Sequence, residues 1–409
     1  MKYILTSADK VKGIVTLPTS KSISNRVLII NALSGSDMPI KGVSDCDDTR
    51  AMLQVLQSDD THFDVGAAGT SMRFLTAFLS KILGQWEITG SERMKNRPIK
   101  LLVEALNDLG ARIEYIEKEG YPPLRIFGSA LQGGKITMQG NVSSQYISAL
   151  LMLAPTMQDG LRLTLEGAVV SVPYITMTLK IMEQFGVKSY WIGNEIHVPY
   201  QAYEPVPFSV EGDWSAASYW YEMVALAQNA EIELKGLHKM SVQGDAAIAT
   251  IFEHIGVKTK FTKEGVLLSK KEVEKGKFVY NFVNQPDLAQ TCVVACCLKG
   301  ISFYFSGLQS LKIKETDRIH ALVTELGKLG YVLHAKDDSI LEFNNERCDA
   351  SYDVSIDTYE DHRMAMAFAP ACIKLGKVII NEPHVVTKSY PTFWEDLKNV
   401  GFGLFAVEE

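Results

Sequence analysis

Apolar residues recur along the chain with the period of an α-helix, in segments that end at a glycine. Before Gly330, the residues Ile319, Leu322 and Leu326 stand at i, i+3 and i+7, which predicts an amphipathic helix that stops at this glycine. The same spacing precedes Gly256. The glycine can adopt the left-handed conformation that ends many helices, so these segments have both a periodic body and a defined end.

Two short runs follow each of these helices and predict a β-hairpin. Residues 187–191 and 195–198 flank the turn Gly193-Asn194, and residues 332–335 and 340–343 flank a turn at Asp337-Asp338. Other helical segments are apolar on all sides, which is typical of helices that lie inside a layer of other helices. Examples are residues 147–154, 291–298 and 364–373.

Both kinds of helix recur with one shared period of about 70 to 76 residues. The amphipathic series ends at Gly110, Gly186, Gly256, Gly330 and Gly401. The more apolar series starts at Gly69, Ser143, Asp213, Asp287 and Asp361. The pattern predicts about six β-α-β-α-β-β units of an α/β protein. The first unit is truncated, because Asp59-Asp60 leads almost directly into the next helix.

The chain of 409 residues is too long for one hydrophobic core, so we expect two domains of three units each. The best internal boundary is the proline-rich stretch at residues 203–207. Any binding site should then be built from equivalent corners of several units.

Composition narrows the functional classes. The apolar content of 46% and charged content of 22% are ordinary for a soluble globular protein. No apolar run reaches the ~18 residues that cross a membrane, and the N-terminus lacks a signal-peptide pattern. The six cysteines show no C-x-x-C spacing, and no His, Cys or carboxylate cluster has a metal-ligand spacing. We expect a cytoplasmic protein with no metal and no membrane partner.

The net charge of −7 argues against nucleic acid as a partner, yet basic residues gather at predicted helix starts. A helix N-terminus offers free N–H groups and a partial positive charge, so an added Lys or Arg makes an anion site. The repetition of this arrangement indicates a basic pocket for small polyanions. The residues concerned are Lys21, Arg26, Arg73, Arg93, Lys95, Arg97, Lys312, Lys314, Arg318, Arg363 and Lys388.

Each of these segments has a simpler interpretation. Residues 20–26 are explained equally by a serine N-cap, residues 66–73 by a glycine-rich turn, and residues 143–145 by capping. Residues 314–318 also read as a solvated charge run. Residues 361–363 are harder to explain structurally, because three ionisable groups at the mouth of an apolar helix cost stability unless they meet a ligand.

Taken together and in order, the motifs resemble the 5-enolpyruvylshikimate-3-phosphate synthase family, essentially from end to end. They are P-x-S-K-S-x-S-N-R at 18–26, A-G-T-x-M-R at 68–73, R-M-K-x-R-P-I at 93–99, S-S-Q at 143–145, E-G-D at 211–213, P-D at 286–287, K-E-T-D-R at 314–318, D-H-R-M-A-M at 361–366 and K-S-Y-P at 388–391.

The resemblance implies a fold and a topology. Each of two domains has three β-α-β-α-β-β units with pseudo-threefold symmetry, an inside-out α/β barrel. The first domain covers residues 20–212, and the second covers residues 1–19 together with 213–409. The active site lies in the cleft between the domains of a monomer.

The resemblance also implies an activity. The enolpyruvyl group of phosphoenolpyruvate is transferred to the 5-hydroxyl of shikimate 3-phosphate in the shikimate pathway, through a tetrahedral intermediate and without a cofactor. The herbicide glyphosate inhibits this family.

Residue roles carry over position by position. Contacts to shikimate 3-phosphate are implied for Lys21, Ser22, Arg26, Ser143, Ser144, Gln145, Ser171, Tyr174, Asp287 and Lys314. Contacts to phosphoenolpyruvate are implied for Lys21, Gly69, Arg97, Gln145, Arg318, Arg363 and Lys388. The catalytic set is Asp287, Glu315, Lys21, Lys388 and His362.

Within the catalytic set, Asp287 is expected to be the base toward the hydroxyl, and Glu315 or a lysine the acid toward the methylene carbon. The sequence leaves open whether Lys21 or Lys388 assists.

Two positions depart from the family pattern. Ala67 stands where the family often has Asn, and Ser310 stands where some relatives place Asn.

Two other functions are weighed against this one. The sister enzymes that act on a UDP-amino sugar carry Lys-Asn near their start and a reactive Cys in a first-domain loop. Here Ser22 follows Lys21, and Cys46 has a different context. A non-catalytic anion-binding scaffold would have lost Asp287, Glu315 or Arg363, and all three are present.

Overall fold

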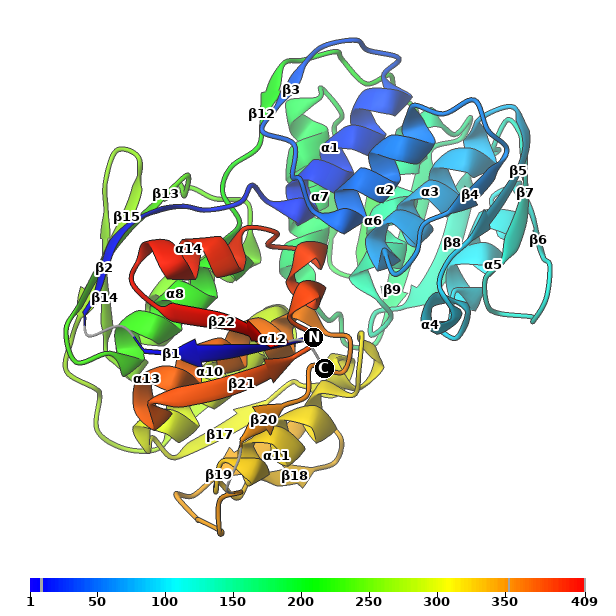
Figure 1. The fold of residues 1–409 in the computed structure, drawn as a ribbon. Helices are drawn as coiled ribbons and strands as arrows, with labels where there is room; N and C mark the ends of the chain where they lie inside the picture. Colours follow the sequence, from blue (N-terminus) through cyan, green and yellow to red (C-terminus); the bar gives the residue numbers. More distant parts are fainter. Residues whose placement is uncertain (8–9, 352–353, 408–409) are drawn as a thin grey trace. The chain divides into compact units, whose positions relative to one another are not determined.

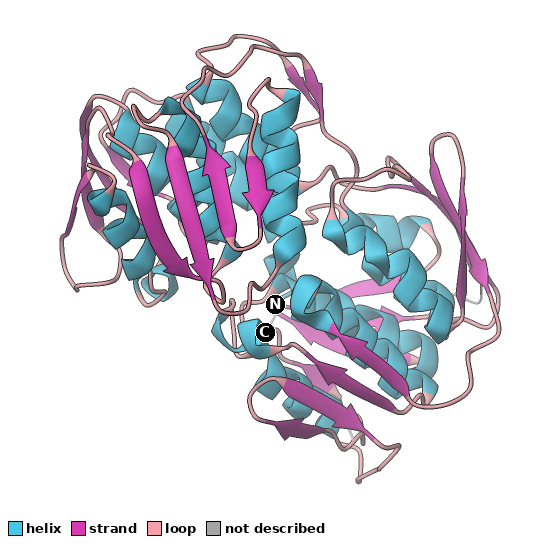
Figure 2. Cartoon of the chain, turned by 180° about the vertical axis from the view of Figure 1, so that it is seen from behind, coloured by secondary structure: helices cyan, strands magenta, loops and turns pink. Residues whose placement is uncertain are grey.

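The computed structural model describes residues 1–7, 10–351 and 354–407 of the 409-residue chain. The chain folds into two compact units (Figure 1). Unit 1 is formed by Met1–Pro18 and Glu211–Glu409, and unit 2 by Thr19–Val210. Each unit is a set of inner helices with sheets laid over them, so that in the view from behind the strands cover helices (Figure 2).

Unit 2 follows the predicted order of helices and hairpins. Its helices are α1 (Lys21–Leu33), α2 (Asp47–Leu56), α3 (Gly69–Lys81), α4 (Glu92–Lys95), α5 (Lys100–Asp108), α6 (Ser144–Leu153) and α7 (Val172–Gln184). Its strands are β3 (Ile40–Lys41), β4 (His62–Asp64), β5 (Gly84–Thr89), β6 (Arg112–Tyr115), β7 (Leu124–Gly128), β8 (Gly134–Gln139), β9 (Leu161–Glu166), β10 (Tyr190–Ile192), β11 (Glu195–Val198) and β12 (Phe208–Ser209).

Unit 1 repeats the plan. Its helices are α8 (Trp214–Leu226), α9 (Ile248–Ile255), α10 (Ala289–Lys299), α11 (Arg318–Lys328), α12 (His362–Phe368), α13 (Cys372–Leu375) and α14 (Phe393–Asn399). Its strands are β1 (Lys2–Thr6), β2 (Val11–Thr16), β13 (Ala230–Lys235), β14 (Val257–Phe261), β15 (Gly265–Lys270), β16 (Phe278–Asn281), β17 (Phe303–Ser306), β18 (His334–Lys336), β19 (Ile340–Phe343), β20 (Ser355–Ile356), β21 (Lys377–Asn381) and β22 (Gly403–Val407).

The sheets show the repeat directly. Unit 2 has the strand orders β4-β5-β7-β6, β10-β11-β9-β8 and β12-β3, and unit 1 has β20-β21-β1-β22, β14-β15-β13-β2 and β16-β17-β19-β18. A parallel pair and an antiparallel hairpin recur, as in β4 beside β5 and β6 beside β7. The sheet β12-β3 has only two strands, whereas the other five sheets have four. The predicted α/β repeat fold is confirmed, and the truncation of the first unit stays a prediction.

The N-terminal strands complete the sheets of unit 1. Strand β1 lies antiparallel between β21 and β22, and β2 pairs in parallel with β13. Each partner is far away in sequence, and backbone hydrogen bonds in the ladder hold these strands in place.

The apolar helix predicted at residues 147–154 is buried in α6 of unit 2, and the one predicted at residues 291–298 lies in the core of unit 1. Every residue of α8 except Ser215 is buried, and α10 is buried from Ala289 to Leu298. Cys292, Cys296 and Cys297 lie in this core, where burial raises the pKa of each thiol and keeps it protonated. None of the described helices is both long and apolar enough to cross a membrane.

One predicted helix start is wrong. Gly69 begins α3, and Ser143, Asp213 and Asp361 are the N-cap residues of α6, α8 and α12. Asp287 instead lies inside a 3₁₀ turn, Pro286–Leu288, and α10 begins only at Ala289. Proline fixes its own backbone and starts this tighter turn, which moves the carboxylate away from a capping position.

Two glycines test how closely the backbone approaches itself. A Cβ on Gly128, at the end of β7, would lie 1.5 Å from the carbonyl oxygen of Ile82, whereas a Cβ on Gly327 in α11 would meet nothing within 4 Å. We expect Gly128→Ala to cost about 3 kcal/mol and Gly327→Ala to gain about 0.5–1 kcal/mol. Chemical denaturation of both variants is the measurement, and equal effects would contradict the assignment of Gly128 to a close backbone approach.

Candidate active site

The N-termini of four helices of unit 2, α1, α3, α6 and α7, lie at one end of a common bundle. Arg26 of α1 donates from Nη2 to Ser148 Oγ in α6 (3.1 Å) and from Nε to Thr178 Oγ1 in α7 (2.7 Å). Gln145 Nε2 at the start of α6 donates to Thr70 Oγ1 at the start of α3 (3.1 Å). Helices joined within two turns of their starts run side by side in the same direction, so their free N–H groups and positive dipole ends converge. We call the residues at these starts the unit 2 cluster.

Arg26 is a buried cation of this cluster, with 3% of its surface exposed. Its remaining hydrogen bonds go to two carbonyl oxygens, those of Ser22 (2.8 Å) and Tyr174 (3.4 Å). All four of these acceptors are uncharged. Burial lowers the pKa of Arg26 to about 10, so the guanidinium stays charged at neutral pH and gives the cluster a fixed positive potential.

Lys21, the first residue of α1, is held by a residue that the sequence motifs did not bring out. Its Nζ lies 3.5 Å from Oδ2 of Asp48, and the Asp48 carboxylate is buried on α2. The Ser20 hydroxyl accepts from the backbone N–H of Ile23, so the N-cap interpretation of this segment is confirmed. The two interpretations are compatible, because the cap uses Ser20 and leaves Lys21 and Ser22 at the helix start.

Gly69 lies directly against two guanidinium groups. Arg73 Nη1 donates to the carbonyl oxygen of Gly69 (3.0 Å), and a Cβ at Gly69 would lie 2.6 Å from Arg97 Nη1 and 3.2 Å from Arg73 Nη1. Glycine at this position therefore leaves room for the Arg97 head group, which a side chain would displace. The neighbouring Ala67, which departs from the family pattern, is exposed.

Two serines of the unit 2 cluster differ in what their hydroxyls do. Ser143 caps α6 by accepting from the backbone N–H of Gln145 (3.3 Å). Ser171 precedes α7 with φ of 55°, a left-handed conformation that is uncommon for serine, and it makes no side-chain cap. Strained backbone of this kind clusters at functional sites. Ser144 and Tyr174 follow at the partly exposed starts of α6 and α7.

The unit 1 cluster is a network of carboxylates and cations from sequence-distant segments. Asp287 Oδ1 lies 3.1 Å from Arg318 Nη1 and 3.5 Å from Lys314 Nζ, while its Oδ2 lies 2.9 Å from Arg363 Nη2. Asp287 thus faces three cations at once. Burial would raise the pKa of this carboxyl, but Arg363, Lys314 and Arg318 outweigh burial and hold the pKa well below its usual range.

Arg318 is the centre of the network, and 1% of its surface is exposed. Besides Asp287, it donates to Asp361 from Nε (2.7 Å) and Nη2 (3.4 Å), and from Nη2 to Glu315 Oε2 (2.9 Å). Glu315 Oε1 in turn lies 3.1 Å from Lys388 Nζ. The interpretation of residues 314–318 as a solvated charge run is therefore wrong, since Lys314, Glu315 and Arg318 take part in this network and Asp317 caps α11.

Asp361 and Arg363 open helix α12. Asp361 Oδ1 accepts from the backbone N–H of Arg363 (2.9 Å), and Arg363 Nη1 donates to the backbone carbonyl of Asp287 (3.3 Å) and to Tyr219 OH (3.4 Å). His362 is buried at the first residue of α12, with its Nδ1 3.8 Å from Asp361 Oδ1. Ser310 lies in a 3₁₀ turn, Gln309–Ile313, just before this network.

Asp245 is an acid of this region that the sequence did not indicate. It is buried, its carboxylate accepts a hydrogen bond from Ser215 Oγ, and it interacts electrostatically with both Asp287 and Arg363. Burial, and then the negative charge of Asp287, raise the pKa of Asp245 to about 6. Two acids with pKa values displaced in opposite directions are therefore neighbours here, an arrangement typical of sites that move protons.

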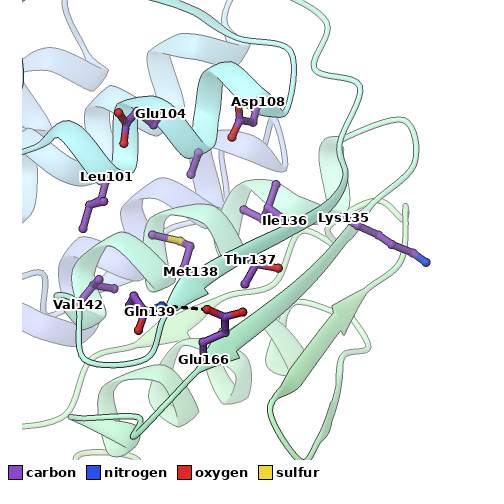
Figure 3. A pocket seen from close by; sticks show the side chains of 11 residues that line it. Leu101, Glu104, Asp108, Lys135, Ile136, Thr137, Met138, Gln139, Val142 and Glu166 are labelled. Carbon is purple, nitrogen blue, oxygen red and sulfur yellow. Dashed lines mark hydrogen bonds between the residues drawn. The ribbon is translucent and has the colours of Figure 1, made fainter.

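A hollow of about 510 Å³ lies elsewhere on unit 2, between α5 and strands β8 and β9 (Figure 3). Its charged lining residues are Glu104, Asp108, Glu166 and one cation, Lys135. An excess of carboxylates repels anions, and the lining includes no residue of either cluster. This hollow does not match the polyanion chemistry that the sequence predicts.

Comparison with known proteins gives one consistent family. The model of the family EPSP synthase (3-phosphoshikimate 1-carboxyvinyltransferase) matches residues 5–59 and 56–397. The 3-phosphoshikimate 1-carboxyvinyltransferase of Bacteroides fragilis (strain ATCC 25285) is 54% identical over 411 aligned positions that cover 100% of both chains. The enzyme of that name from Sulfurovum sp. (strain NBC37-1) is 37% identical and covers 95% of this chain and 97% of its own.

A solved structure shares the fold. The EPSP synthase from Acinetobacter baumannii superposes with a TM-score of 0.78 at 20% identity, over 99% of this chain and 100% of its own. The family match, the full-length relatives and the shared fold agree with the motif order in the sequence. The chain therefore belongs to the EPSP synthase family, the 3-phosphoshikimate 1-carboxyvinyltransferases.

Proposed function

We propose that the two clusters carry out the family's reaction on one pair of substrates. The chain is a transferase that moves the carboxyvinyl group of phosphoenolpyruvate to the 5-hydroxyl of shikimate 3-phosphate and releases phosphate. The assignment of residues rests on one observation. The carboxylate of Asp287 forms ion pairs with three cations, Lys314, Arg318 and Arg363. The pKa of such a carboxylate changes when an anionic substrate binds to the same cations.

Shikimate 3-phosphate is assigned to the unit 2 cluster. The helix starts present N–H groups and dipole ends to its phosphate, and Lys21 and Ser22 add a charge and a hydroxyl. Ser143, Ser144, Gln145 and Ser171 offer hydroxyls and an amide to the sugar-acid ring, and the Tyr174 ring packs against it. Arg26 acts from behind as a buried charge, since its hydrogen bonds already hold Ser22 and Tyr174. Lys314 and Asp287 of unit 1 complete the set.

Phosphoenolpyruvate is assigned to the arginines. Arg318 and Arg363 present planar forks that suit a carboxylate or phosphate, and Lys388 adds a point charge. Lys21, Arg97, Gly69 and Gln145 are its contacts in unit 2. Holding two polyanions together requires this concentration of cations, because the substrates repel each other.

Asp287 becomes a better base once phosphoenolpyruvate binds. An anion that attracts Arg363, Arg318 and Lys314 weakens their hold on the Asp287 carboxylate, so the pKa of Asp287 rises toward that of a useful base. Asp287 then takes the proton of the 5-hydroxyl as this oxygen attacks the substrate carbon.

Glu315 is placed to work with Lys388, 3.1 Å away, as the proton donor to the methylene carbon. The adduct loses phosphate as its methyl group gives up a proton, which restores the vinyl group. His362 completes the proposed catalytic set from the start of α12.

Substrate choice tests the function directly. We expect phosphate release from phosphoenolpyruvate with shikimate 3-phosphate and none with a UDP-amino sugar. Release only with the UDP-amino sugar would overturn the assignment in favour of the sister enzymes.

Asp287→Asn separates charge from shape at the proposed base. Asn keeps the size of the side chain but cannot take a proton, so we expect turnover to fall by ~100-fold or more. The pKa of Asp287 is depressed in the folded chain, so its ion pairs stabilise the fold above the unfolded value of about 3.9 and lose that effect as pH falls. Urea denaturation should show a stability gap between wild type and variant at pH 7 that narrows below about pH 4. Unchanged turnover, or a gap that does not depend on pH, would refute this role.

Gly69→Ala tests the phosphoenolpyruvate pocket with glyphosate, which carries a carboxylate and a phosphonate. The added methyl group must displace the Arg97 head group, which lies 2.6 Å from the Cβ position. We expect glyphosate to inhibit the wild type competitively with phosphoenolpyruvate and to lose roughly 1–3 kcal/mol more affinity than phosphoenolpyruvate in the variant. Inhibition is measured at several phosphoenolpyruvate concentrations, with Gly327→Ala as a glycine control outside both clusters. A wild type insensitive to millimolar glyphosate would remove Gly69 from the pocket.

A further inference from the structure

The segment that leads from β20 into α12 has an unusual backbone. Tyr359 and Glu360 have φ values of 54° and 55°, so two successive residues other than glycine adopt the left-handed conformation directly before Asp361. Each such residue costs about 1 kcal/mol or more, and it persists only where the surroundings impose it. Some contact must therefore hold the segment in this form.

Glu325 of α11 makes that contact. Its side chain is fully buried, and Oε1 accepts from Tyr359 OH at 2.6 Å while Oε2 accepts from the backbone N–H of Asp357 at 3.1 Å. Lys328 Nζ lies 2.8 Å from Oε2 of Glu325 and 2.8 Å from Oδ2 of Asp357. Burial, and then the hydrogen bond to Glu325, raise the pKa of Tyr359, so its hydroxyl keeps the proton that it donates. The carboxylate thus grips the segment on both sides of Thr358.

One helix face grips both ends of the same segment. Arg318 and Glu325 are seven residues apart on α11, which is about two turns, and both are buried. Arg318 binds the side chain of Asp361, and Glu325 binds Asp357 and Tyr359. Residues 357–361 are therefore held at two points by side chains of helix α11.

The position of Asp361 matters for two arginines. Its carboxylate accepts from Arg318 Nε (2.7 Å) and from the backbone N–H of Arg363 (2.9 Å). A shift of Asp361 would turn the Arg318 fork and move the first turn of α12, which carries Arg363. Misplacement by as little as 1 Å can cost ~100-fold where a pocket needs exact geometry.

We propose that Glu325 and Tyr359 form a clamp that positions Asp361, and through it Arg318 and Arg363, for phosphoenolpyruvate. Both are positioning residues that act through Asp361. The inference rests on the proposed function, because it assumes that the two arginines bind phosphoenolpyruvate. A merely structural role would lower stability without selecting one substrate.

Tyr359→Phe removes the clamping hydroxyl and keeps the ring. We expect the KM for phosphoenolpyruvate to rise by about tenfold while the KM for shikimate 3-phosphate, most of whose proposed contacts lie in unit 2, changes by less than about twofold. Tyr221→Phe is the matched control, since Tyr221 OH lies 2.9 Å from Thr259 Oγ1 in the same unit but away from both clusters. That control should lower the thermal midpoint and leave both KM values unchanged.

A second substitution tests the strain itself. Glycine adopts positive φ without penalty, so Glu360→Gly in the Tyr359→Phe background makes the left-handed segment easier to hold. We expect this exposed-site change to return the KM for phosphoenolpyruvate at least halfway to the wild-type value. No rescue, or an equal rise of both KM values in Tyr359→Phe, would overturn the clamp.

Arg363→Lys separates failure of the clamp from failure of the proposed function. A raised KM for phosphoenolpyruvate in Arg363→Lys together with an unchanged one in Tyr359→Phe refutes the clamp alone. An unchanged KM in both variants refutes the assignment of phosphoenolpyruvate to the arginines, and the clamp with it.

Discussion

The contacts of a single buried guanidinium, that of Arg318, determine how three segments of unit 1 are placed relative to one another. It is almost fully out of solvent and touches three carboxylates, those of Asp361, Asp287 and Glu315. Removing one partner of a buried ion pair costs about 3–5 kcal/mol, because the other charge is then left uncompensated. The turn at Asp287, the loop before α11 and the start of α12 must therefore meet at one point. The stability of unit 1 and the geometry of its proposed site depend on the same contacts.

The two units use opposite electrostatic strategies. In unit 1, carboxylates largely compensate the cations, so an arriving anion competes with Asp287 and Glu315 and changes their basicity as it binds. In unit 2, the buried Arg26 donates to uncharged oxygens, and the helix starts add partial positive charges beside Lys21, which is paired with Asp48. That cluster is thus suited to hold an anion without chemical change. This difference between the two clusters fits a reaction in which one substrate keeps its phosphate and the other loses it.

The repeat, the α/β fold and most helix boundaries can be predicted from the sequence, because they depend on local patterns. Asp361 and Arg318 were readable as residues at helix starts. The pairing of Asp287 with Arg363 was not readable, since it joins residues far apart in sequence. Glu325 had no signal at all: on an amphipathic helix a single glutamate looks like a solvated residue. The prediction that Asp287 starts a helix is wrong because Pro-Asp before an apolar run is also the pattern of an N-cap.

The misread position shows how a repeated fold acquires a site. Asp213 and Asp287 occupy equivalent corners of successive repeats, yet Asp213 accepts from the N–H groups of Ser215 and Ala216 and is used up as a cap. At the next corner Pro286 starts a 3₁₀ turn, so Asp287 lies before α10 and its carboxylate turns toward cations instead. Local rules are broken where another interaction offsets the loss, and such positions are often functional. In this chain, the proposed base therefore lies where one repeat departs from the capping geometry that its neighbours keep.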